Sequence, residues 1–126
     1  MIMFKHGDDQ AKEFWLLSPK LQAIATDAAL YVKEHFGKDF IVTSTIRNDG
    51  KIHATGRALD ARSKHLKDEE IAKLDHYINE KYPYGKVSPV TGEPYKTCYY
   101  HKVDDIEDAA YHFHFQCKYD FRIHPK

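Results

Sequence analysis

Residues 111–117, YHFHFQC, alternate apolar and polar side chains without a break. Successive side chains of a strand point to opposite faces, so this alternation predicts a strand with one face in the core. The face expected in the core carries Tyr111, Phe113, Phe115 and Cys117. The other face is expected to carry His112, His114 and Gln116, with neighbouring side chains roughly 7 Å apart. Two such imidazoles can hold a metal ion, or supply one ligand and one proton-transfer group; a half-exposed strand that merely carries histidines is the alternative.

Upstream of this strand, the sequence predicts a helix that begins at Ser18-Pro19. Serine is a favoured N-cap, and proline is favoured at the first helical position. Apolar residues then recur at three- and four-residue spacing up to Phe36, and Gly37 stands where a C-terminal cap glycine is common. The next segment, DFIVTSTIR at 39–47, is rich in β-branched residues and predicts a strand.

A second helix is predicted from about Asp68 to Tyr82, with Asp68 as its N-cap. Prolines and glycines then recur over residues 83–94, which predicts an exposed loop or lid. Two further strands are expected, at 95–103 and 111–119. This order of elements favours an α+β fold with a small antiparallel sheet flanked by helices.

The composition indicates one folded domain over residues 1–126. Nineteen Lys and Arg balance nineteen Asp and Glu, which argues against a nucleic-acid binder, and 42% of residues are hydrophobic. No apolar run approaches the ~20 residues of a membrane span, and the N-terminus lacks a signal-peptide stretch. Cys98 and Cys117 fit no zinc-finger spacing and are expected to be reduced, partly buried thiols. We expect a soluble, cytoplasmic monomer.

Histidine is unusually frequent, at nine residues. Five are expected to be solvated, on termini or helix surfaces: His6, His35, His65, His76 and His124. His101 lies in the predicted strand that precedes an acidic segment, Asp104 to Asp108, and could line a cleft.

A second segment with metal-binding potential is HATGRALD, residues 53–60. His53 and Asp60 can converge if the chain turns at Gly56, because glycine permits unusual backbone angles and close approach. Ala58 and Asp60 would then lie on one face of a short strand, with little side chain to crowd an ion. An ordinary loop with an ion-paired aspartate is the alternative interpretation.

The two segments together point to zinc. His53, Asp60 and His114 form a set of two histidines and one carboxylate, which binds zinc and leaves a position open for water. Structural zinc sites usually use four protein ligands, so a three-ligand set favours catalysis. Zinc lowers the pKa of bound water towards ~7 and polarises a scissile carbonyl.

The run His53-x-x-Gly56-x-Ala58-x-Asp60, followed downstream by His112-x-His114, resembles the LAS zinc peptidases. This group comprises lysostaphin-type enzymes, D-alanyl-D-alanine metallopeptidases and the hedgehog signalling domain. Within it, the chain looks most like the D-Ala-D-Ala carboxypeptidase-like branch, which includes small bacteriophage endolysins. The resemblance covers roughly residues 41–117.

The resemblance implies that His53, Asp60 and His114 are zinc ligands. It also implies a small antiparallel sheet flanked by helices, and a peptide bond of peptidoglycan as substrate. An arginine upstream of the first motif holds the substrate carbonyl or carboxylate in several relatives, and Arg47 occupies that place. The alternative for Arg47 is a solvated residue at the end of a strand.

The chain departs from the family pattern at two positions. Lys51 replaces a serine found two residues before the first histidine in many relatives. Tyr111 replaces the catalytic Glu or Asp that the branch places three residues before the last ligand. Proton transfer could instead fall to His112, as in the His-x-His of lysostaphin-type enzymes, or to Asp105 or Asp108 of the acidic segment.

The leading functional hypothesis is a zinc-dependent peptidase that cleaves stem peptides or cross-links of bacterial cell walls, like a phage endolysin, with His112 and Arg47 as catalytic residues. A second is a phage structural or binding module that kept the zinc and lost catalysis, motivated by Tyr111. A third is a metal-dependent hydrolase with a different substrate. The cleaved bond is not specified by the sequence.

Overall fold

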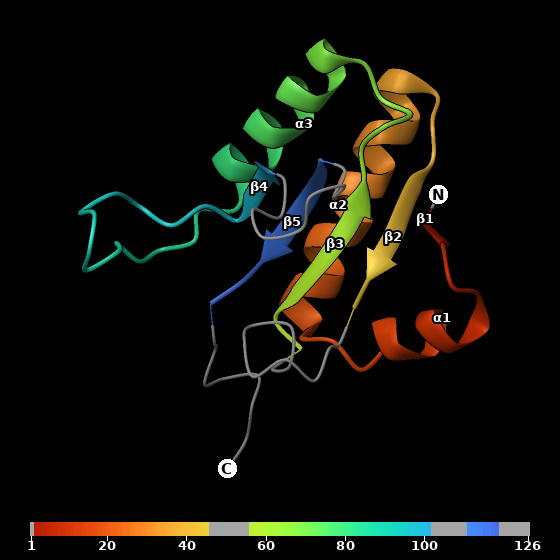
Figure 1. Cartoon of the computed structure of the whole chain (residues 1–126), viewed down its shortest axis with the longest axis horizontal. Coiled ribbons are helices and arrows are strands. Elements are labelled where there is room, and N and C mark those ends of the chain that lie inside the picture. Colours follow the sequence, from red (N-terminus) through yellow and green to blue (C-terminus); the bar gives the residue numbers. More distant parts are fainter. Residues whose placement is uncertain (1, 46–55, 102–110, 119–126) are drawn as a thin grey trace.

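The computed structural model describes residues 2–45, 56–101 and 111–118. Within these ranges, three helices and five strands form a small α+β domain (Figure 1). The helices are α1 (Asp8–Phe14), α2 (Pro19–Phe36) and α3 (Asp68–Lys81). The strands are β1 (Ile2–Phe4), β2 (Phe40–Ser44), β3 (Ala58–Arg62), β4 (Cys98–His101) and β5 (His112–Gln116). The expected α+β class is therefore confirmed.

The five strands form one mixed sheet in the order β1-β2-β3-β5-β4. The pairs β2–β3, β3–β5 and β4–β5 are antiparallel, as expected, but β1 runs parallel to β2. The prediction of a purely antiparallel sheet is therefore wrong at this edge. The physical reason is that α1 and α2 lie between β1 and β2 in the chain, and such a helical crossover returns the second strand in the same direction.

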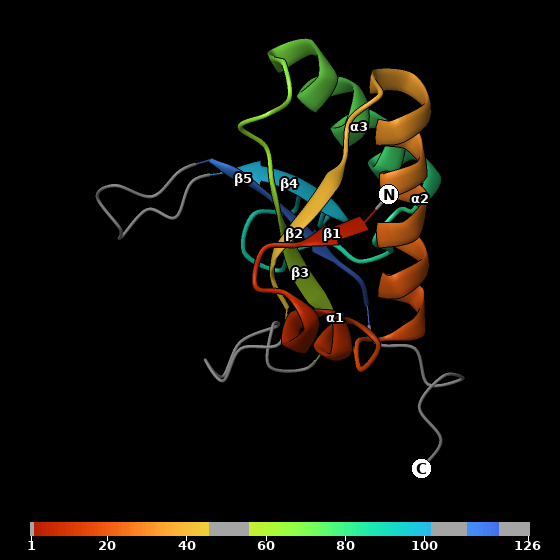
Figure 2. The ribbon, with the colours of Figure 1, turned by 90° about the vertical axis from the view of Figure 1, so that its right-hand side faces the viewer.

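Helices α2 and α3 lie on the same side of the sheet (Figure 2). The core between these layers contains Leu21 and Ile24 from α2, Leu74 from α3, and Phe113 and Phe115 from β5, all at most 1% exposed. The sheet therefore has one face packed on helices, while its other face carries the polar side chains described below. None of the helices in the described ranges combines the length and apolarity needed to cross a membrane.

The ends of α2 match the sequence expectations. The Ser18 hydroxyl accepts a hydrogen bond from the backbone N–H of Leu21, and Pro19 is the first helical residue. Gly37 closes the helix with a positive φ of 66°, a conformation that glycine adopts without a steric penalty.

The start of α3 differs from the expected Asp68 cap. The helix begins at Asp68 itself, and the Glu70 carboxylate accepts a hydrogen bond of 2.8 Å from the backbone N–H of Lys67. Glu70 thus satisfies a donor at the helix entry from inside the first turn. The loop predicted at 83–94 projects from the domain in Figure 1 and contains one bridge between Val87 and Pro94. The strand expected from residue 95 begins later, at Cys98.

The alternation of β5 is confirmed for Phe113, Phe115 and Cys117, which are buried. The prediction that Tyr111 also enters the core is wrong, because its side chain is 55% exposed. Tyr111 precedes β5, and its ring stacks on Tyr100 with centroids 5.3 Å apart at the end of the sheet.

Candidate metal centre

The strands β3 and β5 bring Asp60 and His114 together. The two residues are directly paired in the antiparallel register, with Asp60 opposite His114 and Arg62 opposite His112. Side chains of paired residues project to the same face of a sheet, here the face away from the helices. As a result, Nδ1 of His114 lies 3.1 Å from Oδ1 of Asp60, and only 14% of the His114 side chain and 9% of the Asp60 side chain are exposed.

The chain enters β3 through a turn at Gly56, as the sequence predicts. Gly56 has a φ of 74°, which residues with a Cβ rarely adopt. Its carbonyl oxygen accepts a 2.8 Å hydrogen bond from the backbone N–H of Ser18, at the start of α2. The turn is therefore fixed to the helical layer, and Ala58 and Asp60 follow it at alternate positions of β3.

The imidazole of His114 is oriented by Gln116 on its own strand. The amide nitrogen of Gln116 donates to the carbonyl oxygen of Lys96 at 2.9 Å. A carbonyl oxygen only accepts, so the amide nitrogen must face Lys96 and the amide oxygen must face His114. That oxygen lies 3.1 Å from Nε2 of His114, which must therefore carry a hydrogen.

This orientation determines what can lie between His114 and Asp60. With a hydrogen on Nε2, a neutral imidazole presents the lone pair of Nδ1 to a carboxylate oxygen 3.1 Å away. Two acceptors at that distance are stabilised by a positive charge, either a second proton on the imidazole or a metal ion bound to both atoms. A cation at this position would therefore satisfy both acceptors.

The spacing of the two atoms fits a zinc ion. Two ligand atoms that each lie 2.0–2.1 Å from a tetrahedral zinc ion are about 3.3 Å apart. The observed 3.1 Å separation therefore needs little movement of either strand to accept the ion. The bond from Nε2 to Gln116 is the outer interaction that zinc-binding histidines usually make, with the other ring nitrogen held by a neighbouring acceptor.

His112 lies on the same face, one alternate position before His114. Its Nε2 is 3.9 Å from Oδ2 of Asp60, and its side chain is 18% exposed. His112 therefore lies next to the second oxygen of Asp60, while His114 is the histidine next to Oδ1. Its neighbour in β4 is His101, by backbone register.

Several predicted site residues fall outside the described ranges: His53, Arg47, Asp105 and Asp108. The structure describes two of the three expected zinc ligands and brings them together, and it leaves the position of His53 a prediction. Among the residues that the structure describes, no three His, Cys, Asp or Glu side chains form a group that could hold a metal ion.

A cleft beside the pair contains residues that the sequence analysis missed. Asp60 and His112 line it together with Lys5, Arg62 and Lys64. Arg62 could have been recognised, because it lies two residues after Asp60 and alternate strand positions share a face. Lys5 could not have been recognised, because no pattern in the sequence indicates that β1 joins the sheet.

The remaining histidines and the cysteines give a mixed outcome. His6, His35 and His76 are exposed, as expected. His65 is not: its Nε2 is 2.7 Å from the carbonyl oxygen of Asp39, and its Nδ1 is buried. The reason is that His65 lies between β3 and α3, where the chain packs against the segment before β2.

Cys98 and Cys117 are free thiols, and both are buried. Burial raises the pKa of both thiols. A raised pKa keeps a thiol protonated at neutral pH, and the thiolate is the nucleophilic form. These residues therefore act as small core side chains.

Comparison with known proteins adds no further assignment. No protein-family model matches the chain, and no curated protein matches it either.

Proposed function

We propose that this protein is a zinc-dependent peptidase that hydrolyses a peptide bond in the stem peptides or cross-links of peptidoglycan, in the manner of a phage endolysin. The finer fold assignment, to the hedgehog and D-Ala-D-Ala peptidase-like group, belongs to the same proposal. It is supported by the motif residues His53 to Asp60 and by His112-x-His114. The observation that carries it is the register of β3 and β5, which places Asp60 Oδ1 and His114 Nδ1 3.1 Å apart on one sheet face.

In this proposal His53, Asp60 and His114 hold the zinc ion. When bound, zinc supplies a Lewis acid and lowers the pKa of a bound water towards ~7. Gln116 keeps the Nδ1 lone pair of His114 directed at the metal position, since it accepts the hydrogen of Nε2. Asp60 contributes negative charge from a side chain that is only 9% exposed, which strengthens its interaction with a cation.

His112 is the proposed proton-transfer residue. Its Nε2 lies 3.9 Å from the far oxygen of Asp60, on the edge of the cleft where a peptide can approach. An imidazole titrates near neutral pH and can therefore both accept and donate a proton during a hydrolytic cycle. Arg47 is proposed to bind the substrate carbonyl or carboxylate, for which a planar guanidinium is suited.

Tyr111 supports one alternative function. It stands where the D-Ala-D-Ala branch has a catalytic carboxylate, and its side chain is an exposed phenol rather than a carboxylate. The alternative is a zinc-containing structural or binding module of a phage that no longer hydrolyses peptides. A carboxylate from Asp105 or Asp108 would favour catalysis over this alternative.

The deciding experiment is a digest of purified peptidoglycan by the zinc-loaded protein, with and without a chelator, analysed by mass spectrometry. Chelator-sensitive release of new amino termini is the expected result, and the product masses identify the bond. One zinc bound per chain without cleavage of several wall types would favour the non-catalytic module. Absence of zinc binding would contradict both functions.

A further inference from the structure

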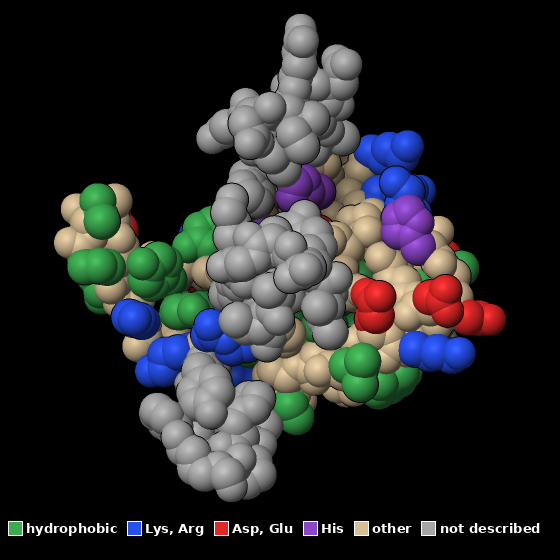
Figure 3. All heavy atoms as spheres, turned by 60° about the horizontal axis from the view of Figure 1, so that its bottom comes forward, with side chains coloured by type: hydrophobic (Ala, Val, Ile, Leu, Met, Phe, Trp, Pro, Cys, Tyr) green, Lys and Arg blue, Asp and Glu red, His purple; other side chains and the backbone are tan. Residues whose placement is uncertain are grey.

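The cleft beside Asp60 has an excess of positive charge. It encloses about 240 Å³ and is lined by Lys5, Thr43, Asp60, Arg62, Lys64 and His112, among other residues. We call it the basic cleft. Figure 3 shows Lys and Arg side chains next to His side chains on the face turned towards the viewer.

Three separate elements contribute the cations of the basic cleft. Lys5 directly follows β1, and its backbone N–H donates to the carbonyl oxygen of Val42 in β2 at 2.9 Å. Arg62 ends β3 and is paired with His112 of β5. Lys64 follows Arg62 at the next alternate position. The parallel addition of β1 therefore completes one side of the cleft.

Some lysines of the described chain form ion pairs, and the cations of the basic cleft do not. Lys38, Lys81 and Lys96 each lie within 3.3 Å of a carboxylate oxygen. Lys5, Arg62 and Lys64 form no ion pair within the described part of the chain. Asp60 is the carboxylate that lines the cleft with them, and it faces the two histidines.

We propose that the basic cleft binds a carboxylate of the substrate, and so selects peptides with a free carboxylate beside the bond that is cut. Asp60 and His112 line both the cleft and the candidate metal centre, so the carboxylate belongs within about one residue of the reacting carbonyl. Arg62 can bind it through two parallel N–H groups, with Lys5, Lys64 and the Thr43 hydroxyl as further donors. This inference rests on the proposed peptidase function and extends it to substrate selection.

Stem peptides offer two sources for such a carboxylate. One is the C-terminal carboxylate, which would indicate carboxypeptidase action. The other is the free carboxylate of an internal D-Glu, which would indicate cleavage within the peptide. The two sources share one chemistry, and amidation of either group separates them.

The test uses three forms of one stem pentapeptide: the free acid, the C-terminal amide, and the form with the D-Glu carboxylate amidated. The ratio of kcat/KM between acid and amide is measured for the wild type, Arg62→Gln and the control Lys73→Gln. Lys73 is an exposed lysine on α3, outside the cleft. Since charge-assisted hydrogen bonds contribute about 1.5–3 kcal/mol, one amidation should lower kcat/KM by about 10- to 100-fold in wild type and control.

In Arg62→Gln we expect this ratio to fall towards one, because the free acid loses its advantage while the amide changes little. Lys64→Gln gives the same test, with a smaller effect, if Arg62→Gln does not fold. Equal cleavage of acid and amides by the wild type would overturn the inference and leave the peptidase intact.

A binding measurement separates the two proposals. Calorimetric titration of the three peptides into zinc-free protein measures the acid preference without catalysis. A preference that Arg62→Gln abolishes supports the basic cleft even if no peptide is cleaved. The absence of any acid-dependent binding or cleavage would contradict it.

Discussion

Two aspartates on opposite sides of the sheet form contrasting polar clusters. Asp27 in α2 accepts hydrogen bonds from the hydroxyls of Tyr77 and Tyr82 at 2.8 and 2.6 Å, and its carboxylate is 2.6 Å from Nζ of Lys81. Asp60 in β3 instead faces the ring nitrogens of two histidines. Both carboxylates are largely buried, but Asp27 is surrounded by phenol and ammonium groups and Asp60 by imidazoles.

The difference indicates a different role for each cluster. Phenol and ammonium groups carry their protons throughout the neutral range, so the protonation of the Asp27 cluster does not change there. The cluster therefore acts as a structural contact between α2 and α3. An imidazole nitrogen can hold a proton or a metal ion in the same place. The Asp60 cluster can therefore accept either a proton or a metal ion, as the proposed metal centre requires.

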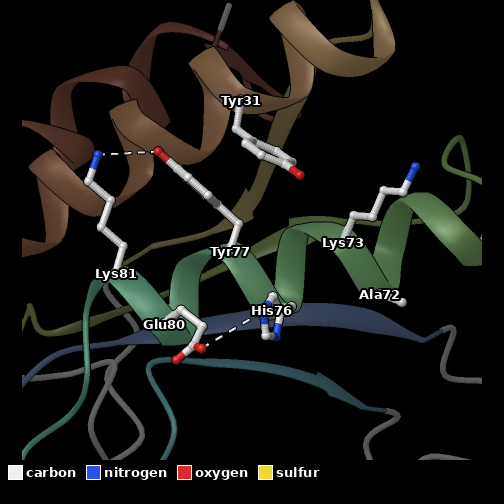
Figure 4. A pocket seen from close by; sticks show the side chains of 7 residues that line it. All are labelled: Tyr31, Ala72, Lys73, His76, Tyr77, Glu80 and Lys81. Carbon is white, nitrogen blue, oxygen red and sulfur yellow. Dashed lines mark hydrogen bonds and ion pairs between the residues drawn. The ribbon is translucent and has the colours of Figure 1, made fainter.

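The hollow between α2 and α3 shows the same contrast (Figure 4). Tyr31 and Tyr77 stack there with centroids 4.2 Å apart, and Nζ of Lys81 lies 3.2 Å from the Tyr77 hydroxyl. His76 lies 3.9 Å from the Glu80 carboxylate. In this hollow, therefore, the Lys81 ammonium and the His76 ring each have a polar partner, whereas Lys73 lines the hollow without an ion pair in the described part of the chain.

The largest expected effect is the loss of zinc in His114→Ala. Structural zinc binding is worth about 10–16 kcal/mol over three or four ligands, so removing one should weaken affinity roughly a thousandfold. Competition with a chromogenic chelator measures this, and circular dichroism checks the fold. The matched control is His76→Ala, which removes an exposed histidine. Unchanged zinc affinity in His114→Ala would show that His114 is not a zinc ligand and that the ion binds elsewhere.

The next effect separates metal binding from catalysis at the neighbouring histidine. His112→Ala should retain zinc, while kcat falls by about 10²- to 10⁴-fold, the range for losing a general acid or base. The chelator competition and the peptidoglycan digest are run on the same preparation. Full activity in this variant would show that another group transfers the proton. Asp105 and Asp108 would then be the next residues to substitute.

A smaller effect is expected from the residue that orients His114. Gln116→Leu removes the acceptor of Nε2 and should weaken zinc affinity by about 10- to 100-fold. Gln116→Glu keeps an acceptor beside Nε2 and should retain more affinity than the leucine variant, despite losing the donor to Lys96. Equal affinities in both variants would show that the orientation of His114 does not depend on this bond.

The sequence predicts the parts of the site that depend on local patterns. The alternation in β5 places His112 and His114 on one face, and Gly56 marks the turn into β3. Both features follow from backbone geometry over a few residues, which is why they can be recognised without the fold. The register places Asp60 opposite His114 and so joins the two patterns, while their binding of zinc stays a prediction.

The parts that were missed depend on contacts between distant segments. The strand β1 has three residues, too few for a periodic signal, and exists because β2 supplies its hydrogen-bonding edge. Lys5 joins the basic cleft for the same reason. Tyr111 continues an alternating pattern beyond the strand end, where the periodicity no longer determines burial.

The smallest predicted effect tests the Asp27 cluster, which should affect stability alone. Asp27→Asn weakens the acceptor shared by Tyr77, Tyr82 and Lys81, and should lower the free energy of unfolding by about 1–3 kcal/mol with zinc affinity unchanged. Burial alone would raise the pKa of Asp27, but hydrogen bonds from Lys81 and the two tyrosines outweigh it and lower that pKa below 3.8.

A lowered pKa in the folded state stabilises the protein above the unfolded value, and this contribution is lost as the pH falls through the folded value. The wild type should therefore lose stability below about pH 4 more steeply than Asp27→Asn, as measured by urea unfolding at several pH values. Burial and the Asp27 carboxylate raise the pKa of Tyr82 to about 12, so stability is also lost as the pH rises from 10 towards 12. If the free energy of unfolding depended on pH in the same way for both proteins, the charge of Asp27 would not contribute to the contact between the helices.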